Sequence, residues 1–164
     1  MYTNQSANIH IQTLYSWGGS YLSMSYYMTY LVIKLVPCIG VNRQGFARYS
    51  DDIFISTSID RNGAALFISL AAPLLSGKDL ENPVQAVLPC NNGASLDFEI
   101  KPDENKQTSA YLIARKGYST IPFKFASTQS KAYENGKMTT KTEHVDLGIF
   151  IGVLEGYLKG SGQG

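Results

Sequence analysis

Aromatic and basic side chains occur together in two parts of this sequence, and they are the residues best suited to binding a ligand. Aromatic rings stack on the bases of single-stranded nucleic acid, at about 1–3 kcal/mol per base, while Lys and Arg neutralise phosphates. The interleaving therefore predicts a nucleic-acid-binding surface, although burial in the core is the alternative for each ring taken alone. The candidates are Tyr15, Trp17, Tyr27, Lys34 and Arg48 in the first half, and Tyr111, Arg115, Lys116, Tyr118 and Lys124 in the second.

Residues that could catalyse a reaction are few. The only two histidines, His10 and His144, have no second His or Cys at a metal-ligand spacing. The chain has no Gly-Lys-Ser/Thr phosphate loop, no G-x-G-x-x-G after a strand and no G-x-S-x-G elbow. Asp51 and Asp52 could hold a divalent cation, but adjacent strand residues point to opposite faces, which favours a loop or strand-start role. We therefore expect no catalytic residue, no metal site and no cofactor; an enzyme built around Asp51, Asp52 and His144 is the alternative.

Composition is typical of one packed domain. The chain has 164 residues, of which 44% are hydrophobic and 16% charged, and this length supports a single core. The net charge of +1 gives the whole molecule no strong attraction for nucleic acid, so binding would depend on a local patch. Cys38 and Cys90 are too few for a disulfide framework and are expected to be buried or idle thiols.

The sequence shows no sign of a membrane or secretory segment. No apolar run reaches the ~18 residues that a membrane span requires, and "MYTNQSANIH" lacks the layout of a signal peptide. We therefore expect an intracellular protein, cytoplasmic or nucleoid-associated, with no membrane partner; a viral or plasmid origin is compatible with this expectation.

Strand-forming residues dominate the first third of the chain. "IHIQTLYSW" alternates, "GGS" at 18–20 indicates a turn, and 21–36, "YLSMSYYMTYLVIKLV", is expected to be one strand. Residues 46–59 predict a further strand with Ile53, Ile55 and Ile59 facing inward. The apolar residues after Asp60 recur at near-helical spacing, which predicts a helix. We expect Asp60 to cap this helix and Gly77 to end it.

The second half repeats this order of strands and helix. "VQAVLPC" indicates a strand, "NNG" at 91–93 a turn, and "SLDFEIKP" an amphipathic strand. "SAYLIARKG" and "YSTIPFKFA" indicate two more strands, and 127–141 is expected to be an exposed loop or extended hairpin. The stretch "HVDLGIFIGVLEGYLKG" predicts the closing helix.

Two similar segments suggest an internal repeat. At a constant offset of 83, "ALFISLAAPLLSG" (65–77) and "GIFIGVLEGYLKG" (148–160) align Phe67 with Phe150 and Gly77 with Gly160. The predicted fold class is α+β, with two pseudo-symmetric antiparallel sheet-plus-helix units (ββββα repeated) in one domain over residues 1–164. The units span about 9–78 and 83–160, and 1–8 and 161–164 are expected to be flexible tails. Chance similarity between two amphipathic helices is the alternative.

Three stretches resemble one known family. "YLVIKLVPCIG" is similar to a strand that ends in a small-residue loop, "SLDFEIKPDENKQTSAYLIARKG" to a hairpin with a charged turn, and "TIPFKF" before "HVDLGIFIGVLEGYLKG" to a final strand and helix. This organisation resembles the Whirly and PC4-like single-stranded nucleic-acid-binding proteins, including their kinetoplastid guide-RNA-binding relatives. The resemblance implies homotetramers in which strands of nucleic acid lie along sheet edges and the helices pack at the subunit centre.

These observations give a leading hypothesis and an alternative. The leading hypothesis is a non-enzymatic protein that binds single-stranded DNA or RNA, DNA being favoured, with low sequence specificity, in replication, recombination or RNA processing. Its partners would be the nucleic acid and further copies of the chain, as a dimer or tetramer. The alternative is a structural or virion assembly subunit, because tyrosine is enriched at protein interfaces and the N-terminal strands are rich in it.

Overall fold

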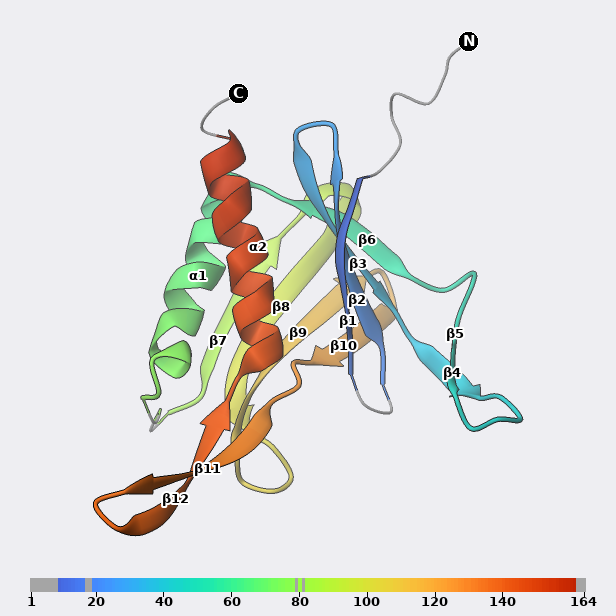
Figure 1. The fold of residues 1–164 in the computed structure, drawn as a ribbon. Coiled ribbons are helices and arrows are strands. Elements are labelled where there is room, and N and C mark those ends of the chain that lie inside the picture. Colours follow the sequence, from blue (N-terminus) through green and yellow to red (C-terminus); the bar gives the residue numbers. More distant parts are fainter. Residues whose placement is uncertain (1–8, 17–18, 79, 81, 162–164) are drawn as a thin grey trace.

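The first half of the chain forms a four-stranded antiparallel sheet followed by a helix. The computed structural model describes residues 9–16, 19–78, 80 and 82–161. The sheet has the order β1-β2-β3-β6 and contains β1 (Ile9–Tyr15), β2 (Tyr21–Tyr27), β3 (Tyr30–Val36) and β6 (Ile55–Ile59). Between β3 and β6, the strands β4 (Cys38–Val41) and β5 (Ala47–Tyr49) form a separate two-stranded hairpin. Helix α1 (Arg61–Leu75) follows β6 directly (Figure 1).

The second half forms another four-stranded antiparallel sheet, a second hairpin and a second helix. The sheet has the order β10-β9-β8-β7. Its strands are β7 (Val84–Pro89), β8 (Ala94–Pro102), β9 (Thr108–Lys116) and β10 (Ser119–Lys124), and the 3-10 turn η1 (Asn91–Gly93) joins β7 to β8. A hairpin of β11 (Thr128–Glu134) and β12 (Lys137–Glu143) precedes α2 (Val145–Ser161). The prediction of an α+β fold with antiparallel sheets and two helices is confirmed.

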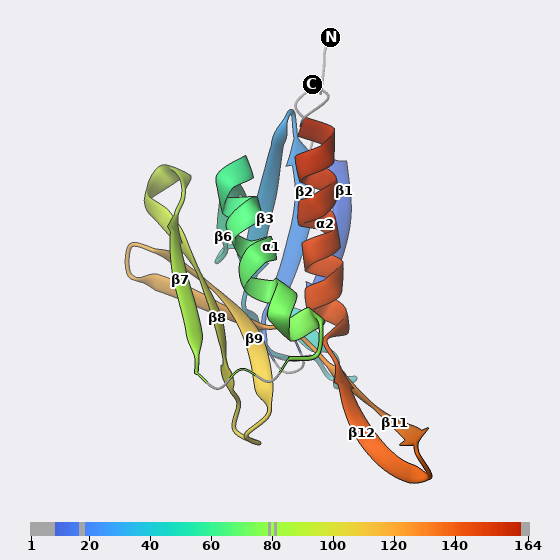
Figure 2. The same ribbon diagram turned by 90° about the vertical axis from the view of Figure 1, so that its left-hand side faces the viewer.

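The two sheets diverge from each other, and both helices lie in the opening between them (Figure 2). The two small hairpins project from this body on opposite sides in Figure 1. Among the described residues, no helix combines the length and the apolar character that crossing a membrane would require.

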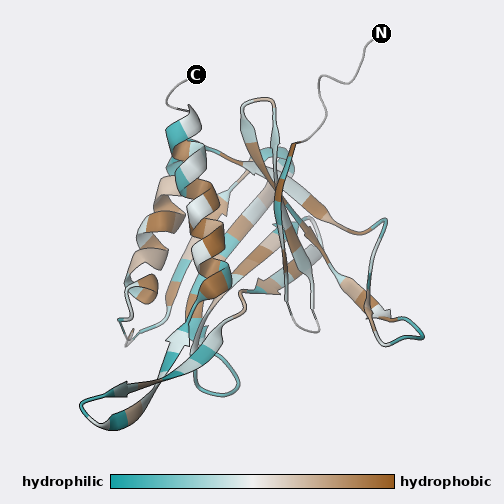
Figure 3. Cartoon of the chain, viewed as in Figure 1, coloured by the Kyte–Doolittle hydropathy of each residue, from teal (hydrophilic) through white to brown (hydrophobic). Residues whose placement is uncertain are grey.

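Strand alternation sends one set of residues from each sheet into a common core. β6 shows this pattern in full, because Ile55, Thr57 and Ile59 are buried while the two serines between them are only partly covered. In β8, Leu96, Phe98 and Ile100 are 0% exposed. Brown and teal residues therefore alternate along the strands in Figure 3.

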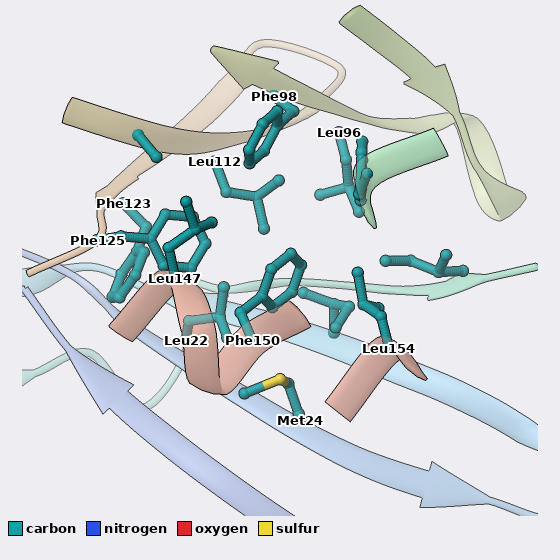
Figure 4. Packing of buried hydrophobic residues seen from close by; sticks show 14 of the residues in the cluster. Leu22, Met24, Leu96, Phe98, Leu112, Phe123, Phe125, Leu147, Phe150 and Leu154 are labelled. Atoms are coloured by element: carbon teal, nitrogen blue, oxygen red, sulfur yellow. The ribbon is translucent and has the colours of Figure 1, made fainter. Parts of the chain in front are cut away.

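The two helices close this core from the open side. Asp60 caps α1 as the sequence predicts, since its Oδ1 accepts a hydrogen bond of 2.7 Å from the backbone N–H of Gly63. Phe67 of α1 and Phe150 of α2 are both 0% exposed, and their ring centroids lie 6.4 Å apart. Figure 4 shows Phe150, Leu147 and Leu154 of α2 pointing into the space between the sheets.

The expectation of one strand over 21–36 is wrong. Met28 and Thr29 form a turn in which Met28 has φ of 56°, and Tyr27 pairs with Tyr30 across it. Because of this turn, Leu31 and the alternate residues after it face the core, and Tyr30 faces outward instead. The run gives no warning of the turn, since it contains no Gly, Pro, Asn or Asp.

The strand expected over 46–59 is interrupted. The Ser50 Oγ accepts hydrogen bonds from the backbone N–H groups of Asp52 and Ile53, at 3.3 and 2.8 Å, and this turn separates β5 from β6. Ile55 and Ile59 face inward as expected, but Ile53 is 54% exposed. The exposed Asp51 lies in the same turn.

Replacing Phe150 should test the importance of the helix contact. We expect Phe150→Ala to lower the free energy of unfolding by about 3–5 kcal/mol, because it removes a fully buried ring. Phe46→Ala is the matched control: that ring is 68% exposed, so its loss should cost less than about 1 kcal/mol. Urea unfolding measures both variants, and equal losses would contradict the assignment of Phe150 to the core.

Candidate nucleic-acid interface

Three tyrosine rings gather at one end of the first sheet's outer face. Tyr15 of β1 and Tyr21 of β2 are direct cross-strand partners, and Tyr49 reaches them from β5. The ring centroids lie 6.0 Å apart for Tyr15 and Tyr21, 5.9 Å for Tyr15 and Tyr49, and 5.0 Å for Tyr21 and Tyr49. We call these residues the tyrosine cluster; its most exposed member, Tyr15, is 57% accessible and can offer a ring face to a base.

An apolar cavity of about 630 Å³ adjoins the tyrosine cluster. Tyr15 and Tyr49 line one part of it, and Val41 and Ala47 of the β4–β5 hairpin line another. Burial raises the pKa of Tyr49, and the nearby Cys38, Tyr15 and Tyr21 raise it further, so its hydroxyl stays protonated at neutral pH. The cavity thus combines apolar walls with a hydroxyl donor, a combination typical of sites for flat organic groups.

Tyr27 lies at the opposite end of the same face, and Lys34 lies between it and the tyrosine cluster. Tyr27 is six positions from Tyr21 on β2, which places the two side chains about 20 Å apart on the same face. Lys34 lies between them on the neighbouring strand, opposite Ser23, and its Nζ is 4.6 Å from the ring centroid of Phe54. This ammonium forms no ion pair among the described residues, so its charge is available to a phosphate.

The outer face of the second sheet holds a separate group of candidates. Lys124 is the direct cross-strand neighbour of Tyr111, and the Lys101 Nζ lies 5.0 Å from the Tyr111 ring centroid. Lys116 and Tyr118 border the β9–β10 turn, where Tyr118 is fully exposed. The structure therefore places Tyr111 beside Lys124, and Lys116 beside Tyr118 at the turn, five residues further along β9.

Two of the predicted basic residues are held by carboxylates. The Arg115 Nε donates to the Asp97 Oδ2 at 3.0 Å, and the Lys124 Nζ donates to the Asp103 Oδ2 at 3.0 Å. Both carboxylates are almost completely buried. These pairs fix the cations on the sheet and cancel much of their charge, so neither is as free to meet a phosphate as Lys116.

The ten predicted residues therefore do not form one continuous cluster. Tyr15, Tyr27 and Lys34 belong to the outer face of the first sheet, and the exposed Arg48 belongs to the β4–β5 hairpin. The second group lies on β9, β10 and their turn. Trp17 lies outside the described residues.

The hydroxyl of Ser20 donates to the carbonyl of Pro122, which joins the start of β2 to β10 where the two sheets meet.

Sequence reasoning missed two residues that contact candidate side chains. Phe54 supports Lys34 and Lys101 contacts Tyr111, and neither was predicted as part of the site. A signal existed for Lys101, because it lies on the polar face of the amphipathic strand that begins at Ser95. No signal existed for Phe54, because its position depends on the turn at Ser50.

The residues considered for catalysis lie apart from one another. His10 is exposed on β1 and its Nε2 is 2.7 Å from the Thr13 Oγ1. Burial lowers the pKa of His144, although the neighbouring Glu143 opposes this effect. Among the described residues, no three His, Cys, Asp or Glu side chains gather in a group that could hold a metal ion.

No protein-family model, curated protein or solved structure matches this chain significantly.

The buried Asp103 should make stability depend on pH. Burial alone would raise the pKa of Asp103, but hydrogen bonds from Lys124, from the backbone of Gln107 and Asn105, and from Ser109 together lower it from 3.8 to about 2. Because the folded-state pKa is lowered, this stabilisation is fully present above about pH 4 and is lost as the pH falls toward 2.

We therefore expect Asp103→Asn to lower the free energy of unfolding by about 1–2 kcal/mol at neutral pH, and the difference from the wild type to shrink toward zero near pH 2. Urea unfolding over this pH range measures it. Glu104→Gln, at the neighbouring exposed carboxylate, is the control and should change stability by less than about 0.5 kcal/mol. A difference that does not vary with pH would contradict this role of Asp103.

Proposed function

We propose that this protein is an intracellular, non-enzymatic protein that binds single-stranded nucleic acid, preferentially DNA, with low sequence specificity. One observation carries the proposal: exposed tyrosine rings lie near cations that have no carboxylate partner among the described residues, on the outer face of the first sheet and at the β9–β10 turn of the second. Tyr118 beside Lys116 at this turn is the clearest case, and Lys34, whose cross-strand partner Ser23 is two residues from Tyr21 of the tyrosine cluster, is the second. Ring faces stack on any base, and ammonium groups contact any phosphate, which accounts for the low specificity. Protection of single strands in replication or recombination fits such binding.

We also propose that the two halves form a pseudo-symmetric repeat of the Whirly-like kind. Support comes from the chain order, in which each four-stranded sheet is followed by a helix that contacts the other half: Phe67 of α1 meets Phe98 of β8, and Tyr157 of α2 meets Tyr26 of β2. Phe67 and Phe150, which the offset of 83 aligns, are both fully buried and lie beside each other. The β4–β5 and β11–β12 hairpins occupy different places in the two halves and distinguish them.

The solvent side of the helix pair supports self-association. Val145 and Ile149 of α2 are 48% and 37% exposed, and Leu75 of α1 is 39% exposed. Gly152 and Gly156 continue this face of α2, and a Cβ at either position would have no neighbour within 4 Å. An apolar helical face that ends in Gly152 and Gly156 allows close approach of a second copy, so we propose a homodimer or homotetramer that uses this helix surface.

An assembly subunit is the second candidate function. Ile39, Val41 and Phe46 of the β4–β5 hairpin are 55%, 68% and 68% exposed, and Figure 3 shows brown segments in this hairpin next to a teal tip. Exposed apolar side chains on a projecting hairpin are typical of a surface that inserts into another subunit. In this interpretation the tyrosine cluster at the base of the hairpin would be part of a protein interface.

Binding to a labelled single strand tests the leading proposal. We expect fluorescence anisotropy to show binding that weakens as salt increases, and Tyr118→Ala to weaken it by about fivefold to a hundredfold, since each stacked base contributes about 1–3 kcal/mol. Tyr133→Ala is the matched control, because Tyr133 is 73% exposed on the β11–β12 hairpin, outside both groups. Lys34→Gln should reduce the slope of log affinity against log salt by about 1.

Two outcomes would contradict this proposal. Equal binding by Tyr118→Ala, Tyr133→Ala and the wild type would show that Tyr118 does not stack on a base. Absence of binding at micromolar protein, together with assemblies larger than a tetramer, would favour the assembly subunit.

Self-association can be tested on α2. We expect the wild-type chain to elute as a dimer or tetramer in size-exclusion chromatography with light scattering, and Gly152→Glu to reduce the mass to that of an 18.0 kDa monomer. The new carboxylate would be buried without a partner in the helix interface, which is unfavourable. Gln129→Glu adds the same charge on the exposed β11 and should leave the mass unchanged. A wild-type monomer, or a variant that still associates, would contradict this interface.

A further inference from the structure

A polar cavity lies at the end of the molecule where three distant segments meet. It has a volume of about 390 Å³ and is bordered by the loop after α1, the β8–β9 loop and the last residues of β12. These segments come together at the base of the β11–β12 hairpin (Figure 1). None of the ten predicted nucleic-acid-binding residues lines this cavity.

Each of the three segments contributes one lysine to the cavity. These are Lys78 after α1, Lys106 in the β8–β9 loop and Lys141 in β12. Lys78 and Lys106 form no ion pair, and the cavity has no carboxylate in its lining, among the residues that the structure describes. Lys141 lies 3.6 Å from Glu143, but both side chains are largely exposed, at 66% and 48%, so this contact screens it only weakly.

Turns in the backbone fix the positions of the segments that carry Lys78 and Lys106. Gly77 has φ of 84° and turns the chain at the end of α1, and the Lys78 N–H donates to the Pro73 carbonyl at 3.0 Å. In the β8–β9 loop, the Asp103 Oδ1 accepts from the backbone N–H groups of Asn105 and Gln107, at 2.8 and 3.0 Å. Asp103 is itself held by Lys124, so its charge is committed to the sheet and does not neutralise the cavity.

Residues with neutral hydrogen-bonding side chains form another part of the lining. Thr108, Thr140, Thr142 and Gln107 border the cavity, together with Leu74, Gly77 and His144. The three lysines that border the cavity carry like charges, and an anion bound there would offset their repulsion with attraction. A phosphate suits this set best, because it carries more than one negative charge near neutral pH and accepts several hydrogen bonds.

We propose that the cavity bordered by Lys78, Lys106 and Lys141 is a phosphate-binding site. The volume exceeds that of one phosphate group, so a part of the molecule that carries the phosphate also fits. The phosphate can belong to a nucleic-acid strand, as a terminal group or a diester, or to a free nucleotide or inorganic phosphate. Only the first source depends on the proposed function, because the cavity shares no residue with the candidate interface.

Inorganic phosphate and pyrophosphate are the direct probes. We expect titration of the full chain at constant ionic strength to shift the amide NMR signals of Lys106–Thr108 and Thr140–Thr142, with a dissociation constant in the millimolar range or tighter. Lys106→Gln and Lys141→Gln should each weaken pyrophosphate binding by about tenfold, whereas the control Lys137→Gln, at the tip of the same hairpin, should stay within about twofold. Absence of shifts up to tens of millimolar, or equal weakening in all three variants, would overturn the site.

Oligonucleotides then identify the source of the phosphate. If the site takes a strand terminus, a 5′- or 3′-phosphate will raise affinity in the wild type and not in Lys106→Gln. If it takes a diester, Lys106→Gln will weaken strands with and without a terminal phosphate. If it takes free phosphates alone, strand affinity will be unchanged while pyrophosphate binding is lost. Because pyrophosphate binding is measured without nucleic acid, failure of the proposed function leaves this test intact.

Discussion

Five phenylalanine rings form one continuous chain of contacts through the centre of the molecule, and the positions of the other elements depend on it. Phe98 of β8 meets Phe67 of α1 at 5.4 Å, Phe67 meets Phe150 of α2 at 6.4 Å, and Phe150 meets Phe125 at 5.2 Å. Phe125 completes the chain with Phe123 of β10 at 5.1 Å. α2 also reaches the first sheet, because Tyr157 lies 6.3 Å from Tyr26 of β2. Close-packed interiors respond to a change in volume of even one methylene, so a shift of either helix would disturb both sheets.

This core decides which side chains are left for the surface. A strand alternates between two faces, and once one face is committed to the phenylalanine chain the other must face outward. The adjacent residues Tyr26 and Tyr27 illustrate this constraint. Tyr26 packs toward Tyr157 inside, whereas Tyr27 lies outside and borders an open groove with Ser56 and Ser58. Two identical residues thus take a structural and a surface role because of their parity along β2. The spacing of exposed rings on the outer face follows from the packing of the inner face.

Because the core enforces this alternation, the periodicity of the sequence predicts most of the elements. The prediction fails where a turn changes which residues of a strand face the core. The strands around Leu96 and Leu112, the Asp60 cap and both helices follow from local patterns that the core enforces. The turn at Met28 could not be predicted, since a non-glycine residue occupies the left-handed region in a run of strand-forming residues. In one unbroken strand over 21–36, Tyr30 would share the inner face with Leu22 and Leu31 would face outward; the turn reverses both. The lysine cavity was also beyond local patterns, because Lys78, Lys106 and Lys141 meet only through tertiary structure. Candidate residues could be named from the sequence, but Phe54, the ring beside Lys34, could not, because its position depends on the turn at Ser50.

Electrostatics then limits what the exposed surface can do. The chain carries 14 Lys and Arg residues against 13 Asp and Glu, so attraction for an anion must come from cations without a carboxylate partner. Lys101, Arg115, Lys124 and Lys141 all have a carboxylate within 4.0 Å, and the first three lie on the outer face of the second sheet. Much of the positive charge on that face therefore organises the sheet. Long-range attraction is weak in such a molecule, and salt screens it further. Under the proposed function, stacking on tyrosine rings, which acts at contact and is insensitive to ionic strength, would carry most of the affinity for a strand, while the few unpaired lysines would determine where the phosphates lie.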